Sequence, residues 1–375
     1  MPTGIVCEFN PFHNGHAYLI SEAKKLIGDN IVCAMSGNFV QRGEFSVADK
    51  YLRAGWAISA GADLVIENPY PFCIASAEYF AASAIKVLAR GGLCDKIAFG
   101  AETGEKEHFF ELAKILLDEK TKKEILALVK DSKNVGYAAA REAYIRENYG
   151  NHLAQLLSNP NCLLGVEYAK AIVKQGFSMD IVPIKRVGAS HDGKPSGDYS
   201  SASYLRGADG AEIKSFCPEY VSCDLKKRPY RKVDIEKYYS VLSSKLLFDE
   251  TGNVKKTAEL SWDYAEKLKK SAVKCDSFEE FFENLKSKHV TDAHLRRALV
   301  FTVTDVKKEN LKNLPSASMV LAFSPDGAKI IKKVKKNENF FLMSKVSDMK
   351  KLCECDKENF EKELFAEKLF LRMCK

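Results

Sequence analysis

Short apolar runs alternate with helix-length segments over the first 210 residues, and this alternation constrains the fold more than any other feature. The runs TGIVCEF, DNIVCAM, DLVIE and DKIAFG have the length of buried strands, and GFSMDIVPIKR adds a fifth. Strands joined by helical crossovers pair in parallel, with helices on both faces of the sheet. The pattern therefore predicts an α/β fold, with a Rossmann-like parallel sheet in residues 1–210.

Several helix boundaries inside this domain can be predicted from their end signals. One helix is expected from about Gly15 to Leu26. A second, in SVADKYLRAGWAISAG, has Ser46 as its expected N-cap and Gly61 just past its end. Residues 104–150 are polar and read as mostly helical, which predicts a helical insertion in the α/β domain.

Beyond residue 210 the pattern changes, and residues 211–375 are expected to form a second, mainly helical region. A basic segment, CPEYVSCDLKKRPYRKVD, opens it, and SMVLAFSPDGAKIIKKVKK predicts a strand, a turn at Pro325-Asp326-Gly327 and a basic helix. This region holds 34 Lys and Arg against 26 Asp and Glu, whereas residues 1–210 hold 23 against 24. The basic excess fits a polyanionic partner or, equally well, a lysine-rich solvated surface.

The eleven cysteines form no recognisable framework. No C-x-x-C pair occurs, and only Cys353 and Cys355 lie close together, which argues against a cysteine-based zinc site. Reduced thiols fit a cytoplasmic protein. The first residues lack the pattern of a signal peptide, and no apolar run reaches the roughly 18 residues of a membrane span. A cytoplasmic location is therefore expected.

The first apolar run ends in NPFHNGH, residues 10–16. In a parallel α/β sheet, ligands bind beyond the carboxyl ends of the strands. Pro11 ends the strand, Gly15 allows close approach of a ligand, and the following helix offers free N–H groups and its positive dipole end to an anion. His13 and His16 can then donate hydrogen bonds to phosphate oxygens, so the segment predicts a nucleotide site.

The histidine pair could instead bind zinc or lie in an ordinary turn at the surface. Zinc is disfavoured because the H-x-x-H spacing does not match the i, i+4 spacing of one helical face, and no acidic residue gives the H-E-x-x-H form. An ordinary turn with two surface histidines is common, but the position between a first strand and a helix makes it less favourable here.

The tetrad HNGH matches the H-x-G-H signature of the adenylyl- and cytidylyltransferase superfamily, which is related to class I aminoacyl-tRNA synthetases. The segments GIVCEFNPFHNGHAYLI, MSGNFVQRGEFSVADK, GADLVIENP and IAFGAE, followed by NPNCLLGVEYAKAI, IKRVGASHD and YSSASYLR, extend the match. In their order and spacing the chain resembles the bacterial tRNA(Met) cytidine acetate ligases. The likeness covers nearly the whole chain and is weaker in HVTDAHLRRAL and LAFSPDGAKIIKKVKK.

This resemblance implies an ATP-dependent reaction in two steps. Acetate and ATP form acetyl-adenylate and pyrophosphate, and the acetyl group then passes to the exocyclic amine of the wobble cytidine in elongator tRNA(Met). We therefore expect ATP and Mg²⁺ to bind, with His13 and His16 as the catalytic residues. We expect no membrane or DNA partner and no residues that bind a metal ion directly. The implied ATP site consists of Val6, Cys7, Glu8, Phe9, Asn10, Pro11, Phe12, His13, Asn14, Gly15, His16, Gly100, Asn161 and Arg186.

Two distant members of that set also have a plainer interpretation. Asn161 can serve as a helix N-cap, and Arg186 can form a surface ion pair. Further cations and polar groups are candidates for acetate or phosphate contacts: Gln41, Arg42, Lys50, Arg53, Ser201, Ser203 and Arg206. MSKVS, residues 343–347, resembles the lysine loop of class I synthetases, but its place far beyond the α/β part indicates coincidence.

The basic segments DLKKRPYRK, HLRRAL and KIIKKVKK are the expected tRNA phosphate contacts. Two other functions stay open at this point. One is an adenylyltransferase that joins ATP to a small phosphorylated metabolite, and the other is a non-catalytic protein that binds ATP and RNA.

Overall fold

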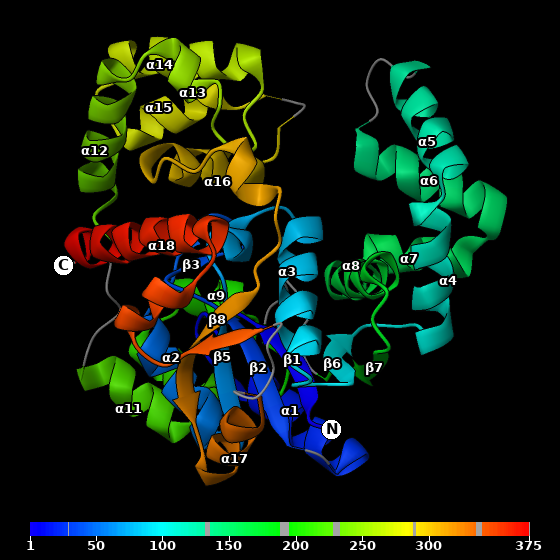
Figure 1. Cartoon of the computed structure of the whole chain (residues 1–375). Helices are drawn as coiled ribbons and strands as arrows, with labels where there is room; N and C mark the ends of the chain where they lie inside the picture. Colours follow the sequence, from blue (N-terminus) through cyan, green and yellow to red (C-terminus); the bar gives the residue numbers. More distant parts are fainter. Residues whose placement is uncertain are drawn as a thin grey trace.

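A seven-stranded sheet runs through the centre of the computed structural model, which describes residues 1–28, 30–131, 136–187, 195–227, 233–287, 290–334 and 340–374 (Figure 1). The strand order is β7-β6-β1-β2-β5-β8-β9. The strands are β1 (Thr3–Cys7), β2 (Ile31–Ser36), β5 (Leu64–Asn68), β6 (Lys96–Ala101), β7 (Asp180–Lys185), β8 (Ala317–Phe323) and β9 (Phe341–Met343). Adjacent strands from β7 to β5 pair in parallel, which confirms the predicted sheet.

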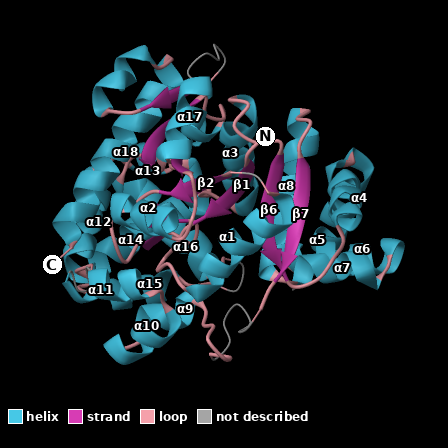
Figure 2. Cartoon of the chain, turned by 90° about the horizontal axis from the view of Figure 1, so that it is seen from below, coloured by secondary structure: helices cyan, strands magenta, loops and turns pink. Residues whose placement is uncertain are grey.

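Helices cover both faces of this sheet, as the view from below in Figure 2 shows. They include α1 (Asn14–Ile27), α2 (Lys50–Ser59), α3 (Ala77–Arg90) and α8 (Pro160–Gln175). In β2, Val32 and Ala34 join one hydrophobic core, whereas Ile31 and Cys33 join the other. Because successive side chains of a strand point to opposite faces, a strand buried on both faces is apolar throughout.

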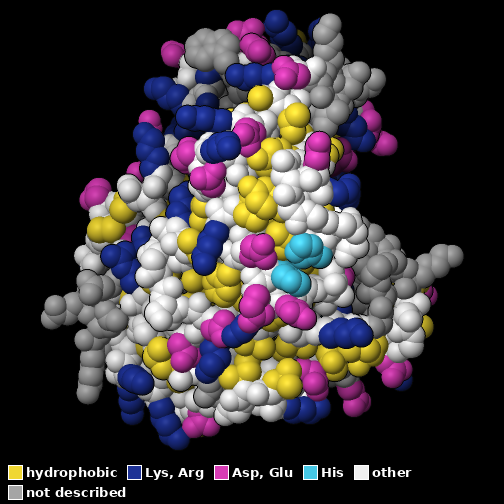
Figure 3. Space-filling view, turned by 90° about the vertical axis from the view of Figure 1, so that its right-hand side faces the viewer, with side chains coloured by type: hydrophobic (Ala, Val, Ile, Leu, Met, Phe, Trp, Pro, Cys, Tyr) yellow, Lys and Arg dark blue, Asp and Glu magenta, His cyan; other side chains and the backbone are white. Residues whose placement is uncertain are grey.

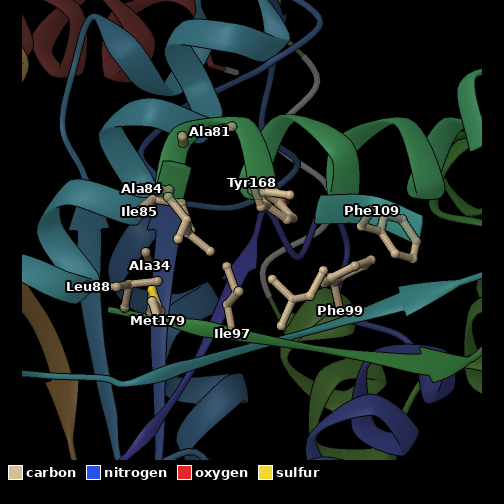
Figure 4. Close-up of a cluster of buried hydrophobic side chains, with 14 of the residues drawn as sticks. Ala34, Ala81, Ala84, Ile85, Leu88, Ile97, Phe99, Phe109, Tyr168 and Met179 are labelled. Carbon is tan, nitrogen blue, oxygen red and sulfur yellow. The ribbon is translucent and has the colours of Figure 1, made fainter. Parts of the chain in front are cut away.

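The first of these cores lies between the sheet and the helices α3 and α8. Figure 4 shows Ile85 and Leu88 of α3 packed beside Ile97 of β6, with Tyr168 of α8 nearby. All four side chains are nearly inaccessible to solvent. This packing fixes the direction of β6, and therefore the position of the residues that follow it.

The second predicted helix begins later than expected. Its N-cap is Asp49, whose side chain accepts the N–H of Leu52 at 2.9 Å, and not Ser46. The Ser46 hydroxyl instead donates to the carbonyl of Ala48 at 2.7 Å in the preceding turn. Both residue types cap helices well, so the sequence alone did not separate them. Gly61 follows the helix at φ +104°, as predicted.

The predicted helical insertion forms an arm beside the sheet (Figure 1). Its helices are α4 (Lys106–Leu117), α5 (Glu119–Asp131), α6 (Tyr137–Tyr149) and α7 (Asn151–Ser158). The arm is anchored where α4 and α7 pack against α8, through Phe109, Leu112 and Leu156. Viewed from the side of the arm, basic and acidic side chains are interspersed on the surface (Figure 3).

Most of the C-terminal part is helical, as predicted. After α9 (Ala202–Gly207), α10 (Gly210–Phe216) and α11 (Glu219–Lys227), a group of helices packs around another core, to which Phe39, Tyr70 and Phe72 of the N-terminal part also contribute. We call this group the C-terminal lobe: α12 (Ile235–Phe248), α13 (Thr251–Val254), α14 (Trp262–Lys274), α15 (Phe278–Leu285), α16 (Asp292–Val303) and α18 (Glu354–Met373). None of the described helices is long and apolar enough to span a membrane.

The chain also crosses the predicted division at residue 210 and returns to the sheet. β8 pairs antiparallel with β5, and β9 pairs with β8, so both complete the sheet begun by residues 1–210. The strand and the basic helix predicted in this segment are confirmed as β8 and α17 (Pro325–Val334), but the turn predicted at Pro325-Asp326-Gly327 is wrong, because the helix begins there. Proline is accepted in a first helical turn, and the Ser324 hydroxyl accepts the N–H of Gly327 at 3.2 Å.

Candidate active site

A cavity of about 410 Å³ lies at the carboxyl ends of β1, β6 and β7. Most of the residues predicted for the ATP site line it, although they come from distant parts of the sequence. They are Val6, Cys7, Glu8, Phe9, Asn10, His13, Gly15, His16, Gly100, Asn161 and Arg186. The edge formed by the carboxyl ends of parallel strands is where ligands bind in such sheets.

Three residues of the predicted set lie behind the wall of the cavity. Pro11 and Phe12 are buried, and the Phe12 ring contacts Phe9 and His16 with centroids 4.8 and 5.6 Å away. The side-chain amide of Asn14 donates to the carbonyl of Asp198 at 2.9 Å. The structure therefore gives these three residues a supporting position in the turn, away from the cavity surface.

The two histidines form a stacked pair at the start of α1, with ring centroids 3.7 Å apart. His13 is the N-cap, and its Nδ1 accepts the N–H of Gly15 at 3.1 Å. His16 closes the capping box, because its Nδ1 accepts the N–H of His13 at 3.3 Å. Since both Nδ1 atoms are acceptors, each neutral ring carries its hydrogen on Nε2. The pair therefore offers two N–H donors.

Burial keeps both rings uncharged at neutral pH. It lowers the pKa of His13 to about 3, with a smaller contribution from Arg186. Burial also lowers the pKa of His16 well below its usual value, helped by His13 and Arg186. The capping roles of both Nδ1 atoms disfavour the zinc interpretation. Among the described residues, the group of metal-ligand type is Cys353, Cys355 and Asp356, which contains no histidine.

The β6–β7 side of the cavity carries the distant residues of the predicted set. Glu102 follows β6, accepts a hydrogen bond from the side-chain amide of Asn161, and lies 3.8 Å from Nε of Arg186. Asn161 is not the N-cap of α8, because Asn159 holds that position. A Cβ atom at Gly100 would approach Cγ of Arg186 to 3.1 Å, so glycine lets the arginine lie along the strand.

The opposite side is a hairpin made of β3 (Phe39–Val40) and β4 (Glu44–Phe45). The N–H of Gln41, at the hairpin tip, donates to Oε1 of Glu8 at 2.6 Å. The Glu44 carboxylate pairs with Arg206 and with Arg296 of α16, each at 3.2 Å. Gln41, Arg42, Glu44 and Arg206 line the cavity. The hairpin therefore connects the cavity with the C-terminal lobe.

Lys50 and Arg53, predicted near the acetate or phosphate, are not at the cavity. Lys50 is buried, and its Nζ lies 2.9 Å from Glu67 and 2.6 Å from Glu363, so it joins α18 to the sheet. The fully buried guanidinium of Arg53 donates to the backbone carbonyls of Glu8, Ser36, Gly37 and Ala48. Apart from Ala48, the partners of Lys50 and Arg53 are distant in the sequence, which is why the motif alone did not reveal these roles.

The serine-rich start of α9 behaves as predicted in part. Ser201 caps the helix by accepting the N–H of Tyr204 at 3.2 Å, and Ser201, Ser203 and Arg206 all line the cavity. Arg206 also donates to the carbonyl of Asn10 at 3.2 Å. The MSKVS segment does not line the cavity, and Met343 ends β9, the edge strand far from β7.

The comparisons with known proteins agree with this geometry. The family model described as HIGH Nucleotidyl Transferase matches residues 1–375. A protein of Acetivibrio thermocellus named tRNA(Met) cytidine acetate ligase is 32% identical, over 99% of this chain and 94% of that protein. The chain belongs to the tRNA(Met) cytidine acetate ligase family.

Solved structures of Thermotoga maritima TmcAL share the fold of this member of the family. The apo form superimposes with a TM-score of 0.90 at 27% identity, covering 99% of this chain and 94% of that one. The form described as bound with alpha-thio ATP gives a TM-score of 0.88 over the same shares. Membership of the ligase family favours this activity over the two alternative functions left open by the sequence.

Sequence reasoning missed the residues that close the cavity from the side. Glu44, Leu164 and Tyr168 line it and lie within quoted motifs but were not predicted as site residues, and Phe80 lies outside those motifs. Phe80 and Tyr168 look like ordinary core positions of helices, and both are in fact buried. A helical period shows which face of a helix is apolar, but not that its edge borders a ligand site.

Proposed function

We propose that the chain is an ATP-dependent ligase that forms acetyl-adenylate in this cavity and transfers the acetyl group to the exocyclic amine of the wobble cytidine in elongator tRNA(Met). The observation that carries the proposal is the stacked, neutral pair of His13 and His16 at the cavity surface. The family name of the relatives supports the choice of acetate and tRNA(Met).

In the first step, an acetate oxygen attacks the α-phosphorus of ATP and pyrophosphate leaves. The reaction needs positioning and stabilisation of the charge that develops on the phosphoryl oxygens, and no covalent enzyme intermediate. Two Nε2–H donors, from His13 and His16, and the N-terminus of α1 supply that stabilisation. Arg186 adds a permanent positive charge on the β6–β7 side, where it can bind phosphate oxygens with two N–H groups.

Mg²⁺ is expected to enter with ATP. Two carboxylates line the described part of the cavity, Glu8 and Glu44. Both oxygens of Glu44 are engaged by arginines, and one oxygen of Glu8 accepts the Gln41 N–H. This donor set does not form a carboxylate cage, so the residues fit an ion held mainly by phosphate oxygens and water. We assign no catalytic step to it.

The lobe side of the cavity is the best surface for tRNA. α16 contacts the hairpin, and Arg296 at its start pairs with Glu44. Arg297, in the predicted HLRRAL contact, is buried and pairs with Glu259 at 2.6 Å, so it stabilises the lobe instead. Residues 228–232 of the DLKKRPYRK contact lie outside the described residues.

The third predicted contact, KIIKKVKK, is badly placed for a bound anticodon. Gly327 of α17 lies against the backbone of Asp63, just before β5 begins. α17 is therefore at the amino-terminal edge of the sheet, whereas the cavity is at the carboxyl edge. Lys335 and Lys336 lie outside the described residues.

The proposal is tested by incubating the purified protein with ATP, Mg²⁺, acetate and total tRNA. We expect acetylcytidine in the digested tRNA by mass spectrometry, and release of AMP that depends on acetate. Loss of tRNA affinity with salt, by a log–log slope of about −0.7 to −0.9 for each phosphate contact, should accompany it. AMP release driven by another metabolite, without acetylcytidine, would contradict the proposal.

A further inference from the structure

Glu8 is the carboxylate whose surroundings suit proton transfer. It follows directly after β1, between the β6–β7 side and the hairpin, and it lines the cavity. Its Oε1 accepts the Gln41 N–H at 2.6 Å, and no described residue hydrogen-bonds to Oε2. Glu44, the other carboxylate among the described cavity-lining residues, has both oxygens paired with arginines. Glu8 therefore has a fixed orientation and an oxygen available to a substrate.

The second step of the proposed reaction requires a base. The cytidine N4 attacks the acetyl carbonyl, a C–N bond forms, and the bond between the acetyl carbon and the phosphate oxygen of AMP breaks. The electron pair of that bond leaves with AMP. N4 starts with two hydrogens and ends with one, so one proton has to pass to an acceptor.

The histidines, the arginines and the buried tyrosine that line the described part of the cavity are poor acceptors. His13 and His16 use their Nδ1 lone pairs in the capping box, and their Nε2 atoms already carry hydrogen. Arginines have no acceptor atom. The phenol of Tyr168 is buried, which raises its pKa above the usual value, so it is a poor proton acceptor at neutral pH. Glu8 is the carboxylate at the cavity with an available oxygen and a position fixed by a hydrogen bond.

The charges around Glu8 adjust its basicity in both directions. Burial raises the pKa of this carboxyl most, and Glu44 of β4 raises it slightly. The Gln41 N–H, Arg206 of α9 and Arg53 of α2 oppose that rise. The carboxylate is thus a stronger base than an exposed glutamate and is more effective in proton transfer.

Glu8 also lies toward the C-terminal lobe, the side from which the cytidine of the tRNA would enter the cavity. The hairpin that fixes its Oε1 is in direct contact with α16 of the lobe. At Gly43, φ is +71° and an added Cβ would lie 2.5 Å from the backbone nitrogen of Arg297. The contact is therefore too close for any other residue, and it fixes the hairpin beneath the lobe.

We propose that Glu8 is the general base of the acetyl-transfer step, accepting the N4 proton of the cytidine on Oε2. This assignment rests on the proposed function. It separates the two steps of the reaction, because acetyl-adenylate formation needs no proton acceptor: acetate attacks as the anion.

The test compares Glu8→Gln with the unmodified protein in two assays. Acetate-dependent exchange of pyrophosphate into ATP reports the first step. Single-turnover acetylation of tRNA from preformed acetyl-adenylate reports the second. We expect acetyl transfer to fall roughly 100-fold or more relative to exchange, in the range typical of a lost general base.

Two further variants make the result decisive. Glu8→Asp keeps a carboxylate, so its transfer rate should rise with pH as in the unmodified protein, whereas the rate for Glu8→Gln should lose that rise. Glu78→Gln changes an exposed glutamate of α3 that pairs with Lys174, and both steps should be unchanged. If Glu8→Gln does not fold, the pH profile of Glu8→Asp carries the test.

Three results have distinct meanings. Equal transfer rates for Glu8→Gln and the unmodified protein would overturn the assignment. An equal loss of exchange and transfer would also overturn it, because Glu8 would then act on ATP. If the unmodified protein shows neither acetate-dependent exchange nor transfer, the proposed function fails, and this result is independent of Glu8.

Discussion

The β6–β7 side of the cavity and the helix α2 differ in how their polar and charged residues are used. On the β6–β7 side, Arg186 and Asn161 line the cavity as their motifs predicted. In α2, Lys50 and Arg53 do not reach the cavity and are buried in contacts that hold the fold together. Strand ends deliver their next residues to a common edge, whereas a cation on a helix binds whichever partner the fold brings to it. The following variants test this difference.

The largest effect is expected for Lys50→Met. Removing the lysine leaves Glu67 and Glu363 buried without their cation, which typically costs about 3–5 kcal/mol of folding free energy. Chemical denaturation measures the loss. Lys25→Met, which removes an exposed pair with Glu22, is the control and should leave the free energy of unfolding nearly unchanged. A stable Lys50→Met protein that cannot form acetyl-adenylate would show that Lys50 acts in the reaction and does not mainly stabilise the fold.

His16→Ala removes one of the two Nε2–H donors at the start of α1. The barrier to acetyl-adenylate formation should rise by about 3–4 kcal/mol, so we expect acetate-dependent exchange of pyrophosphate to slow roughly 100- to 1000-fold. Binding of tRNA should be nearly unchanged, as measured by filter binding. His152→Ala, on an exposed position of α7, is the matched control. Joint loss of exchange and tRNA binding would mean that the two sites are not separable.

Arg186→Met should weaken ATP binding without changing the fold. A lost hydrogen bond to a charged phosphate is worth about 1.5–3 kcal/mol, so the dissociation constant should rise roughly 10- to 100-fold in titration calorimetry. Arg146→Met on the arm, where the arginine pairs with Glu142, is the control. Unchanged ATP affinity in Arg186→Met would show that the arginine serves only its ion pair with Glu102.

The smallest effect is a dependence of stability on pH. The folded pKa of His13 is about 3, below its unfolded value of 6.5, so the unfolded state binds more protons between these values. The contribution of His13 to the free energy of unfolding is therefore fully present above pH 6.5 and is lost as the pH decreases toward 3. Between pH 7 and pH 5.5 the free energy of unfolding should decrease by about 1 kcal/mol because of this histidine. Urea unfolding of His13→Asn should show a smaller decrease, and an equal decrease would exclude His13 as its source.

Much of the α/β part could be predicted because its signals are local. Apolar runs such as IVCAM are buried on both faces of the sheet, and their continuous apolar composition predicts this burial. The return of β8 to the sheet could not be predicted in the same way. Its pairing with β5 joins residues separated by about 250 positions, and periodicity within either segment says nothing about that contact.

The sequence by itself determined the strands of the parallel sheet, the turn between β1 and α1, and the place of the two histidines at the start of that helix. Each depends on neighbours within a few positions. The tertiary structure decided which cations reach the cavity and which hold the fold, through partners such as Glu363 for Lys50 and Arg296 for Glu44. It also fixed the position of Glu8, because a carboxylate is oriented by the donors that the folded chain brings to it.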